Sequence, residues 1–307
     1  MWRTVIVNRG EKITIRNRWL VVYGDQREQK VPVDDLYAVV LENGASLVSV
    51  NVLSTLAQAG AHVYCCDDRH LPVAVSLPLN TYHKPLSILK RQLELPDVMK
   101  DGLWEKIVRQ KIKNQALCLK YRGVASETVQ AVMGLAEDTR PGDVSNREAV
   151  AARKYFRALF GSTFKRSDDG DITNAALNYG YSILRSSVGK TVVAHGYTGV
   201  VGLHHINESN PLNLADDLME PLRPLVDLWT DAHCEELWET LNKTNRRDLI
   251  SLVNMPVKMD GKKMRVRYAL DVYVKSLTSA IMKNDVELLR LPTLLQLDEF
   301  FEDDLDG

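Results

Sequence analysis

The chain has 307 residues, of which 45% are hydrophobic and 26% are charged. This ordinary globular composition argues against long disordered segments, and the length leaves room for two domains. The 39 basic and 40 acidic side chains give a formal net charge of −1, so the chain lacks the overall positive charge typical of nucleic-acid-binding proteins, and any DNA contact requires clustered basic residues.

Nothing in the sequence indicates export or insertion into a membrane. No apolar run approaches the roughly 20 residues needed to span a bilayer, and the strand-like N-terminus soon becomes charged, unlike a signal peptide. The cysteines lack zinc-site spacing and are expected to be buried free thiols, which suit a reducing compartment. They are Cys65, Cys66, Cys118 and Cys234. We therefore expect a cytoplasmic protein with no membrane partner.

Short β-branched or aromatic runs, separated by turn residues, fill most of residues 1–79. They are Val5–Val7, Ile13–Ile15, Trp19–Tyr23, Val31–Val33, Tyr37–Leu41, His62–Cys66 and Val73–Leu77. One helix interrupts them, with Ser49 as a suitable N-cap and Gly60 at its C-terminal end. This pattern predicts an N-terminal β-sandwich-like domain or partial barrel.

The chain then changes from strands to helices. Pro78, Pro85 and Pro96 punctuate the transition, so we expect residues 80–95 to connect two domains. Residues 96–307 are predicted to be mainly helical, over Trp104–Tyr121, Asp143–Phe160, Asn174–Arg185, Arg246–Leu252 and Val272–Lys283. The predicted fold class is therefore α+β, with a β-rich domain at residues 1–79, a connector at 80–95 and a larger α-helical domain at 96–307.

A basic hairpin is predicted late in the chain. Asp260-Gly261 is a strong signal for a two-residue turn between two alternating segments. The basic residues that crowd it are Lys258, Lys262, Lys263, Arg265 and Arg267. Such a cluster either contacts DNA phosphates or only keeps the ribbon soluble, and the sequence leaves both interpretations open.

The segment Gly202–Pro224 contains the strongest candidate for chemistry. Adjacent histidines, His204 and His205, precede an acidic helical segment in which Asp217 and Glu220 are three residues apart and share one face. With Glu148 as a third ligand, one imidazole and two carboxylates suit Mg²⁺ or Mn²⁺ better than zinc. Such ions assist phosphoryl transfer, which makes a metal-dependent nuclease one interpretation.

Each of these residues also has a structural interpretation. Glu148 lies three residues after Ser145, which is the spacing of a capping box. The side chains of adjacent histidines diverge, so at most one of them faces a given site. Asp217 and Glu220 alone are also compatible with an ordinary polar helix face. The spacing of residues along the chain cannot show whether Glu148 approaches His205 and Glu220 in the folded protein.

Four segments in a fixed order resemble one family. They are EAVAARKYF at Glu148–Phe156, NAALNYGY at Asn174–Tyr181, GLHH at Gly202–His205 and LADDLMEPLRP at Leu214–Pro224. The chain resembles the CRISPR-associated Cas-one integrases, in particular their type II branch, and the similarity extends to the N-terminal run Thr55–Asp68. The resemblance implies an N-terminal β-domain followed by a larger α-helical catalytic domain. It also implies a homodimer, two of which flank a Cas-two dimer.

The resemblance further implies a reaction and the residues that perform it. A divalent cation, Mg²⁺ or Mn²⁺, would be held by Glu148, by His205, three residues after Gly202, and by Glu220, with Asp217 as an auxiliary acid. In some family members the last ligand is Asp, so Glu220 is a longer variant. The reaction would join prespacer 3′-hydroxyl ends to a CRISPR repeat by transesterification. The expected partners are two double-stranded DNAs, the prespacer and the CRISPR repeat, together with other type II adaptation proteins. The expected location is the bacterial cytoplasm. A standalone metal-dependent nuclease and a DNA-binding scaffold with a vestigial metal site remain alternatives.

Overall fold

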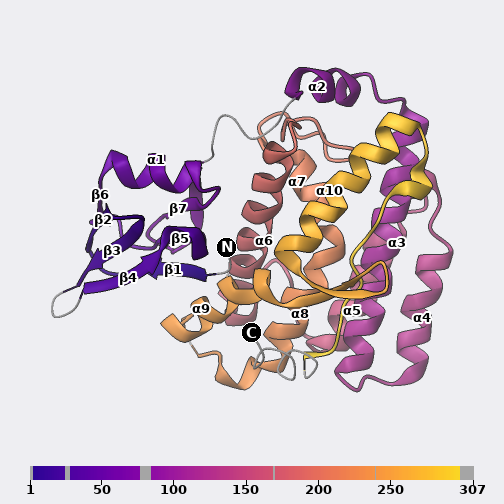
Figure 1. Ribbon diagram of the computed structural model, residues 1–307. Helices are drawn as coiled ribbons and strands as arrows, with labels where there is room; N and C mark the ends of the chain where they lie inside the picture. The colour runs from indigo at the N-terminus through magenta and orange to yellow at the C-terminus, as the bar shows by residue number, and fades with distance from the viewer. Residues whose placement is uncertain (1–2, 25–27, 77–83, 169, 239, 298–307) are drawn as a thin grey trace. The chain divides into compact units, whose positions relative to one another are not determined.

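A computed structural model describes residues 3–24, 28–76, 84–168, 170–238 and 240–297 (Figure 1). Its chain divides into two compact units, Met1–Thr81 and Tyr82–Gly307. The first consists mainly of strands and the second mainly of helices, so the predicted α+β class is confirmed. In the segment expected to be a connector, Pro85–Leu93 forms helix α2, while residues 77–83 lie outside the described part of the chain.

The first unit contains two four-stranded sheets and one α-helix in its described residues. One sheet has the order β1 (Arg3–Val7), β5 (Leu36–Leu41), β7 (His62–Cys66) and β8 (Pro72–Ser76). The other has the order β4 (Glu28–Pro32), β3 (Trp19–Tyr23), β2 (Lys12–Arg16) and β6 (Leu47–Val48). Helix α1 spans Val50–Gln58 and follows the predicted N-cap Ser49. Leu20, Leu36 and Leu56 are fully buried in the core of this unit.

The first sheet is partly parallel, which the strand pattern alone does not predict. β1 and β7 both pair with β5 in parallel, and β8 pairs with β7 in antiparallel orientation. The residues of β5 from Leu36 to Val40 are all buried, as is typical of parallel strands covered on both faces. The prediction that every cysteine is buried was wrong. Cys118 is buried, whereas Cys65 and Cys234 are exposed.

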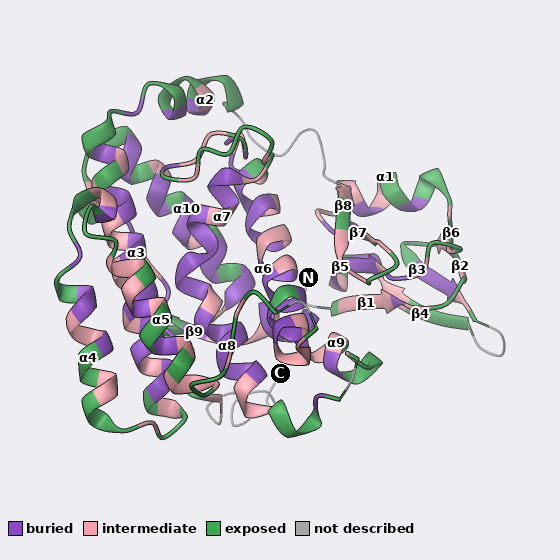
Figure 2. Ribbon diagram, turned by 180° about the vertical axis from the view of Figure 1, so that it is seen from behind, coloured by how far each residue is buried: buried purple, intermediate pink, exposed green. Residues whose placement is uncertain are grey.

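The second unit is a helical bundle around the long helices α3 and α6. Its helices are α2, α3 (Asp97–Tyr121), α4 (Ser126–Glu137), α5 (Arg147–Leu159), α6 (Ile172–Ala194), α7 (Asn213–Met219), α8 (Arg223–Ala232), α9 (Lys243–Ser251) and α10 (Val266–Lys283). Figure 2 shows that buried residues dominate α6, α7 and α10, whereas α2 and α4 each expose one face. The sequence patterns missed α4 and α8 and underestimated the length of α3, α6 and α10. Within the described ranges, no helix is both long and apolar enough to span a membrane.

The predicted hairpin is present. Strands β9 (Pro256–Met259) and β10 (Lys262–Arg265) are antiparallel, and the turn residues Asp260 and Gly261 have φ angles of 49° and 81°. Both values are left-handed, as a type I′ hairpin turn requires.

The basic residues assigned to this hairpin have different surroundings. Lys258, Lys262 and Lys263 are exposed, and Arg265 is half-buried. Arg267 instead belongs to α10, is only 5% exposed and donates a hydrogen bond to Asn254. Its guanidinium therefore does not contribute to the exposed basic surface.

Candidate metal centre

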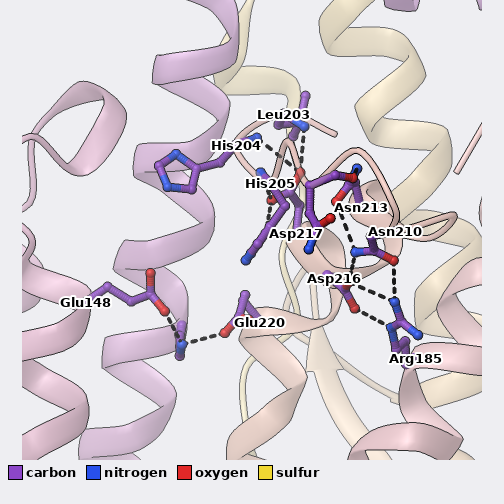
Figure 3. Close-up of polar contacts among 12 residues, drawn as sticks. Glu148, Arg185, Leu203, His204, His205, Asn210, Asn213, Asp216, Asp217 and Glu220 are labelled. Atoms are coloured by element: carbon purple, nitrogen blue, oxygen red, sulfur yellow. Dashed lines mark hydrogen bonds and ion pairs between the residues drawn. The ribbon is translucent and has the colours of Figure 1, made fainter. Parts of the chain in front are cut away.

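His204 and His205 lie in the loop between α6 and α7. This loop is organised around the carboxylate of Asp217 in helix α7. This side chain is completely buried. Its Oδ2 accepts hydrogen bonds from the backbone nitrogens of Leu203 at 2.5 Å and His204 at 3.1 Å, and its Oδ1 accepts one from the backbone nitrogen of His205 at 3.1 Å. Three consecutive backbone N–H groups thus converge on one acid, which fixes the loop to the helix (Figure 3).

The same carboxylate sets the orientation of the His205 ring. Nδ1 of His205 lies 2.6 Å from Oδ1 of Asp217. An imidazole that donates its Nδ1 hydrogen to a carboxylate keeps the lone pair on Nε2, which is the usual arrangement of a metal-binding histidine. The hydrogen bond to Asp217 also raises the pKa of His205 above its ordinary value. Figure 3 shows that the ring extends from the loop towards Glu220.

A second layer of polar contacts holds the rest of this loop. Asn213 Nδ2 donates to the carbonyl oxygens of Val200 and Asn207 at 3.0 and 2.9 Å. Arg185 from α6 donates to Oδ1 of Asn210 in the loop at 2.6 Å and to both carboxylate oxygens of Asp216 in α7, at 2.5 and 3.0 Å. The loop is therefore anchored to α6 and α7, and its conformation does not depend on His205 alone.

His204 has a different environment from His205. Its ring stacks on Trp104 of α3, with ring centroids 4.3 Å apart and an interplanar angle of 3°. The two histidine rings do not diverge as expected: their centroids are 5.9 Å apart at 89°, and the His205 ring also meets Trp104 edge-on, with centroids 5.8 Å apart. His204 is stacked on Trp104, whereas His205 also extends towards Glu220 (Figure 3).

Glu148 and Glu220 are brought together by a lysine that the sequence did not single out. Nζ of Lys111, in the middle of α3, lies 2.5 Å from Oε1 of Glu148 and also forms an ion pair with Oε2 of Glu220. Glu148 belongs to the first turn of α5, and Glu220 begins the 3₁₀ turn η3 (Glu220–Leu222) after α7. Three separate elements thus meet at one ammonium group. Lys111 follows Ile107 by four residues and therefore lies on the apolar face of α3, which is the sequence signal that could have distinguished it from the more exposed lysines of this helix.

The opposite charges of Glu220 and Lys111 keep both of these side chains ionised. Burial tends to raise the pKa of Glu220, but the charges of Lys111 and Arg223 outweigh it and hold this pKa below its usual value. Burial tends to lower the pKa of Lys111, but Glu220 and Glu148 outweigh it in turn and raise this pKa. Arg223 Nε donates to the second oxygen of Glu220 at 2.8 Å. Glu220 is therefore an ionised acceptor whose side chain is held in place from two sides.

The capping-box interpretation of Glu148 was wrong. Helix α5 has Asn146, not Ser145, as its N-cap residue. Asp143 accepts hydrogen bonds from the backbone nitrogens of Arg147 at 2.8 Å and Glu148 at 3.0 Å. Because Asp143 satisfies these two donors, the side chain of Glu148 is available to face Lys111.

A second buried acid, Asp227, supports Arg223 indirectly through Tyr181. Asp227 of α8 accepts hydrogen bonds from the hydroxyl groups of Tyr155, at 2.9 Å, and Tyr181. Burial raises the pKa of Asp227 to about 6. The guanidinium of Arg223 lies over the ring of Tyr181, 4.7 Å from its centroid. This packing restrains the arginine that holds Glu220.

The donors present fit a hard divalent cation. Two carboxylates and one imidazole with its lone pair on Nε2 suit Mg²⁺ or Mn²⁺. Oε2 of Glu220 is buried and, apart from its ion pair with Lys111, makes no hydrogen bond, so it is an acceptor that a cation would satisfy. Among the residues that the structure describes, no three His, Cys, Asp or Glu side chains are already arranged around an ion position. Lys111 lies between the two glutamates instead.

Comparisons with known proteins agree with this architecture. Residues 4–236 match the family model described as CRISPR associated protein Cas1. The CRISPR-associated endonuclease Cas1 of Neisseria meningitidis serogroup C (strain 8013) is 38% identical over 307 residues, covering 97% of this chain and 98% of the relative.

Solved structures share the fold at lower sequence identity. A casposase bound to integration product has a TM-score of 0.75 at 18% identity, covering 92% of this chain and 93% of that chain. A chain of a Cas6-RT-Cas1–Cas2 complex has a TM-score of 0.70 at 18% identity, covering 96% of this chain and 36% of that chain. The resemblance found in the sequence motifs is confirmed, and the chain belongs to the Cas1 family of CRISPR-associated proteins.

Proposed function

We propose that this chain is a divalent-metal-dependent DNA integrase and endonuclease of CRISPR adaptation. It joins the 3′-hydroxyl ends of a prespacer to a CRISPR repeat by transesterification. The observation that carries the proposal is that Glu148 and Glu220 approach a single cationic group, with His205 extending towards Glu220 from a loop fixed by Asp217. Family membership supports the same reaction class, because the Neisseria relative is named an endonuclease.

In this proposal the residues have distinct roles. Glu148, Glu220 and Nε2 of His205 would hold Mg²⁺ or Mn²⁺. When bound, such an ion neutralises charge on the scissile phosphate and lowers the pKa of the attacking hydroxyl. Asp217 does not bind the ion but orients His205 and keeps its Nδ1 hydrogen engaged. Arg223 holds Oε1 of Glu220, so Oε2, which pairs with Lys111, is the oxygen that would bind the ion.

The DNA partners are the double-stranded prespacer and repeat. The exposed Lys258, Lys262 and Lys263 of the β9–β10 hairpin are candidates for contacts with their phosphates. The protein acts as a homodimer together with a Cas2 dimer and with other type II adaptation proteins in the bacterial cytoplasm. The fold likeness to a chain of a Cas6-RT-Cas1–Cas2 complex supports the Cas2 partnership.

A strand-transfer assay tests this function. Labelled prespacer and a plasmid with a CRISPR repeat are incubated with the protein, with and without Cas2, in Mg²⁺, Mn²⁺ or EDTA. We expect joined products only with metal, and their loss in Glu148→Gln, which retains DNA binding. Glu137→Gln on the exposed surface of α4 removes the same charge and should leave joining intact. Short fragments without joined products would indicate a standalone nuclease, and DNA binding without any cleavage or joining would indicate a scaffold.

A further inference from the structure

Lys111 occupies the position that links the two proposed acidic ligands. Its ammonium contacts Oε1 of Glu148 and Oε2 of Glu220. The side chain of Lys111 is 8% exposed and that of Glu220 is 4% exposed, so this contact is shielded from water on the Glu220 side. Surface ion pairs contribute little to stability, but a buried charge that loses its partner is strongly destabilising. Lys111 therefore contributes to the charge balance of Glu220 together with Arg223, and it links Glu220 to the more exposed Glu148.

The backbone around Lys111 is fixed relative to Glu220. Three residues further along α3, Asn114 Nδ2 donates to the carbonyl oxygens of Pro221 at 2.7 Å and Pro292 at 3.0 Å. Pro221 directly follows Glu220 in η3. Because the helix is tied to η3 in this way, the ammonium can separate from Glu220 only by rotation of its own flexible side chain.

A divalent cation held by Glu148 and Glu220 would compete with this ammonium for the same carboxylate oxygens. Two positive groups in contact with the same oxygens would repel each other, most strongly on the buried Glu220 side. Glu148 is 29% exposed, so the side of the cluster next to Glu148 is the one that opens towards solvent. The ammonium can leave the cluster on that side while Glu220 stays held by Arg223.

We propose that Lys111 is a built-in competitor of the divalent cation: it pairs Glu148 with Glu220 while the site is empty and must be displaced when the ion binds. This inference rests on the proposed function, because it assumes that both glutamates are ligands. Lys111 thus keeps the acids preorganised at low metal concentration and raises the concentration at which the site fills. It is a positioning residue, not a catalytic one.

The direct test is Mn²⁺ binding without DNA, measured by calorimetry and by electron paramagnetic resonance of free Mn²⁺. Lys111→Met keeps an unbranched, flexible side chain that is one atom shorter and removes its charge. We expect this variant to bind Mn²⁺ at least about tenfold more tightly, a factor equivalent to about 1.4 kcal/mol. In EDTA it should unfold at a lower temperature than the unaltered protein, and Mn²⁺ should restore more of its stability. Lys120→Met, on the exposed end of the same helix, is the matched control and should change neither quantity.

The outcomes separate this inference from the proposed function. If Glu148→Gln abolishes Mn²⁺ binding, the proposed metal site stands. If Lys111→Met then binds Mn²⁺ as well as or more weakly than the unaltered protein, the proposed role of Lys111 is overturned. Mn²⁺ binding that is unaffected by Glu148→Gln would overturn the metal site itself and the inference with it. If Lys111→Met does not fold, Lys111→Gln provides the same comparison, since it also lacks the charge.

A structure of the unaltered protein with Mn²⁺ gives a test independent of any variant. The inference predicts that Nζ of Lys111 is then more than about 4 Å, the usual limit for an ion pair, from at least one of the two glutamates. An ammonium that still contacts both glutamates beside a bound ion would contradict it.

Discussion

The carboxylate of Asp217 lies 2.6 Å from Nδ1 of His205 and also accepts the backbone hydrogen of the same residue. One buried acid thus fixes both the backbone and the ring of the histidine that we propose as a metal ligand. An acid in this position controls the tautomer and direction of the imidazole without touching the ion.

The first prediction concerns this acid. Asp217→Asn retains an oxygen acceptor but loses one of the two oxygens that satisfy the loop. We expect Mn²⁺ affinity to fall by about 10- to 100-fold, the usual effect of losing such a supporting partner, and stability to fall by about 1–3 kcal/mol because buried donors lose their acceptor. Calorimetry and chemical denaturation measure the two effects. Glu208→Gln, an exposed acid of the same loop, is the control. Unchanged metal affinity in Asp217→Asn would show that the orientation of His205 does not depend on this carboxylate.

The second prediction concerns Gly202. A Cβ atom at this position would lie 2.4 Å from the carbonyl oxygen of His205 and 2.7 Å from Oδ2 of Asp217. Gly202→Ala must therefore displace the loop, and we expect weaker Mn²⁺ binding together with a lower melting temperature. Gly134→Ala in α4 meets no atom within 4 Å and should instead stabilise the protein by about 0.5–1 kcal/mol, as Ala does in a helix. Equal behaviour of the two variants would contradict the close packing of the loop.

The third prediction is a pH dependence of stability that arises from Asp227. Burial raises its pKa from 3.8 to about 6, so the folded state binds a proton that the unfolded state has already released. This contribution is fully present below pH 3.8 and is lost as the pH rises through about 6, and it amounts to roughly 3 kcal/mol or less.

Asp227→Asn cannot titrate, so its free energy of unfolding should fall less between pH 4 and pH 7 than that of the unaltered protein. Urea denaturation at several pH values measures the difference between the two curves. The exposed Asp138→Asn serves as the control, since its curve should parallel the unaltered one. Parallel curves for Asp227→Asn would exclude a raised pKa.

The fourth prediction concerns the β9–β10 hairpin. If Lys258 and Lys262 each neutralise one DNA phosphate, then Lys258→Gln and Lys262→Gln should each weaken DNA binding and lower the slope of log affinity against log salt by about 1. Lys243→Gln, on the exposed surface of α9, is the matched control. A slope that is unchanged in both hairpin variants would leave the hairpin with a solubilising role. Arg267→Gln should mainly reduce stability, because Arg267 is buried against Asn254.

The sequence predicted what local patterns encode. The turn at Asp260-Gly261, the helix after Ser49 and the change from strands to helices all follow from residue types at fixed spacings. It did not predict the parallel pairing of β1, β5 and β7, because strand direction depends on how distant segments meet. Helix α4 was also missed, although its apolar residues Val132 and Leu135 are buried.

The candidate site was predicted only in part, for a related reason. Motif resemblance selected Glu148, His205 and Glu220, but their surroundings depend on contacts between residues far apart in the chain. Lys111 is separated from Glu148 by 37 residues, and only the fold brings them into contact. The sequence also did not show that Asp143 caps α5, because this assignment depends on the first residue of the helix, which is Arg147.

The most direct test of the proposed metal site is anomalous diffraction from crystals of the unaltered protein soaked in Mn²⁺. We predict one strong anomalous peak coordinated by Glu148, Glu220 and Nε2 of His205, with Asp217 still bonded to Nδ1. An ion bound elsewhere under conditions in which the protein joins DNA, with none at these three side chains, would contradict the proposed site.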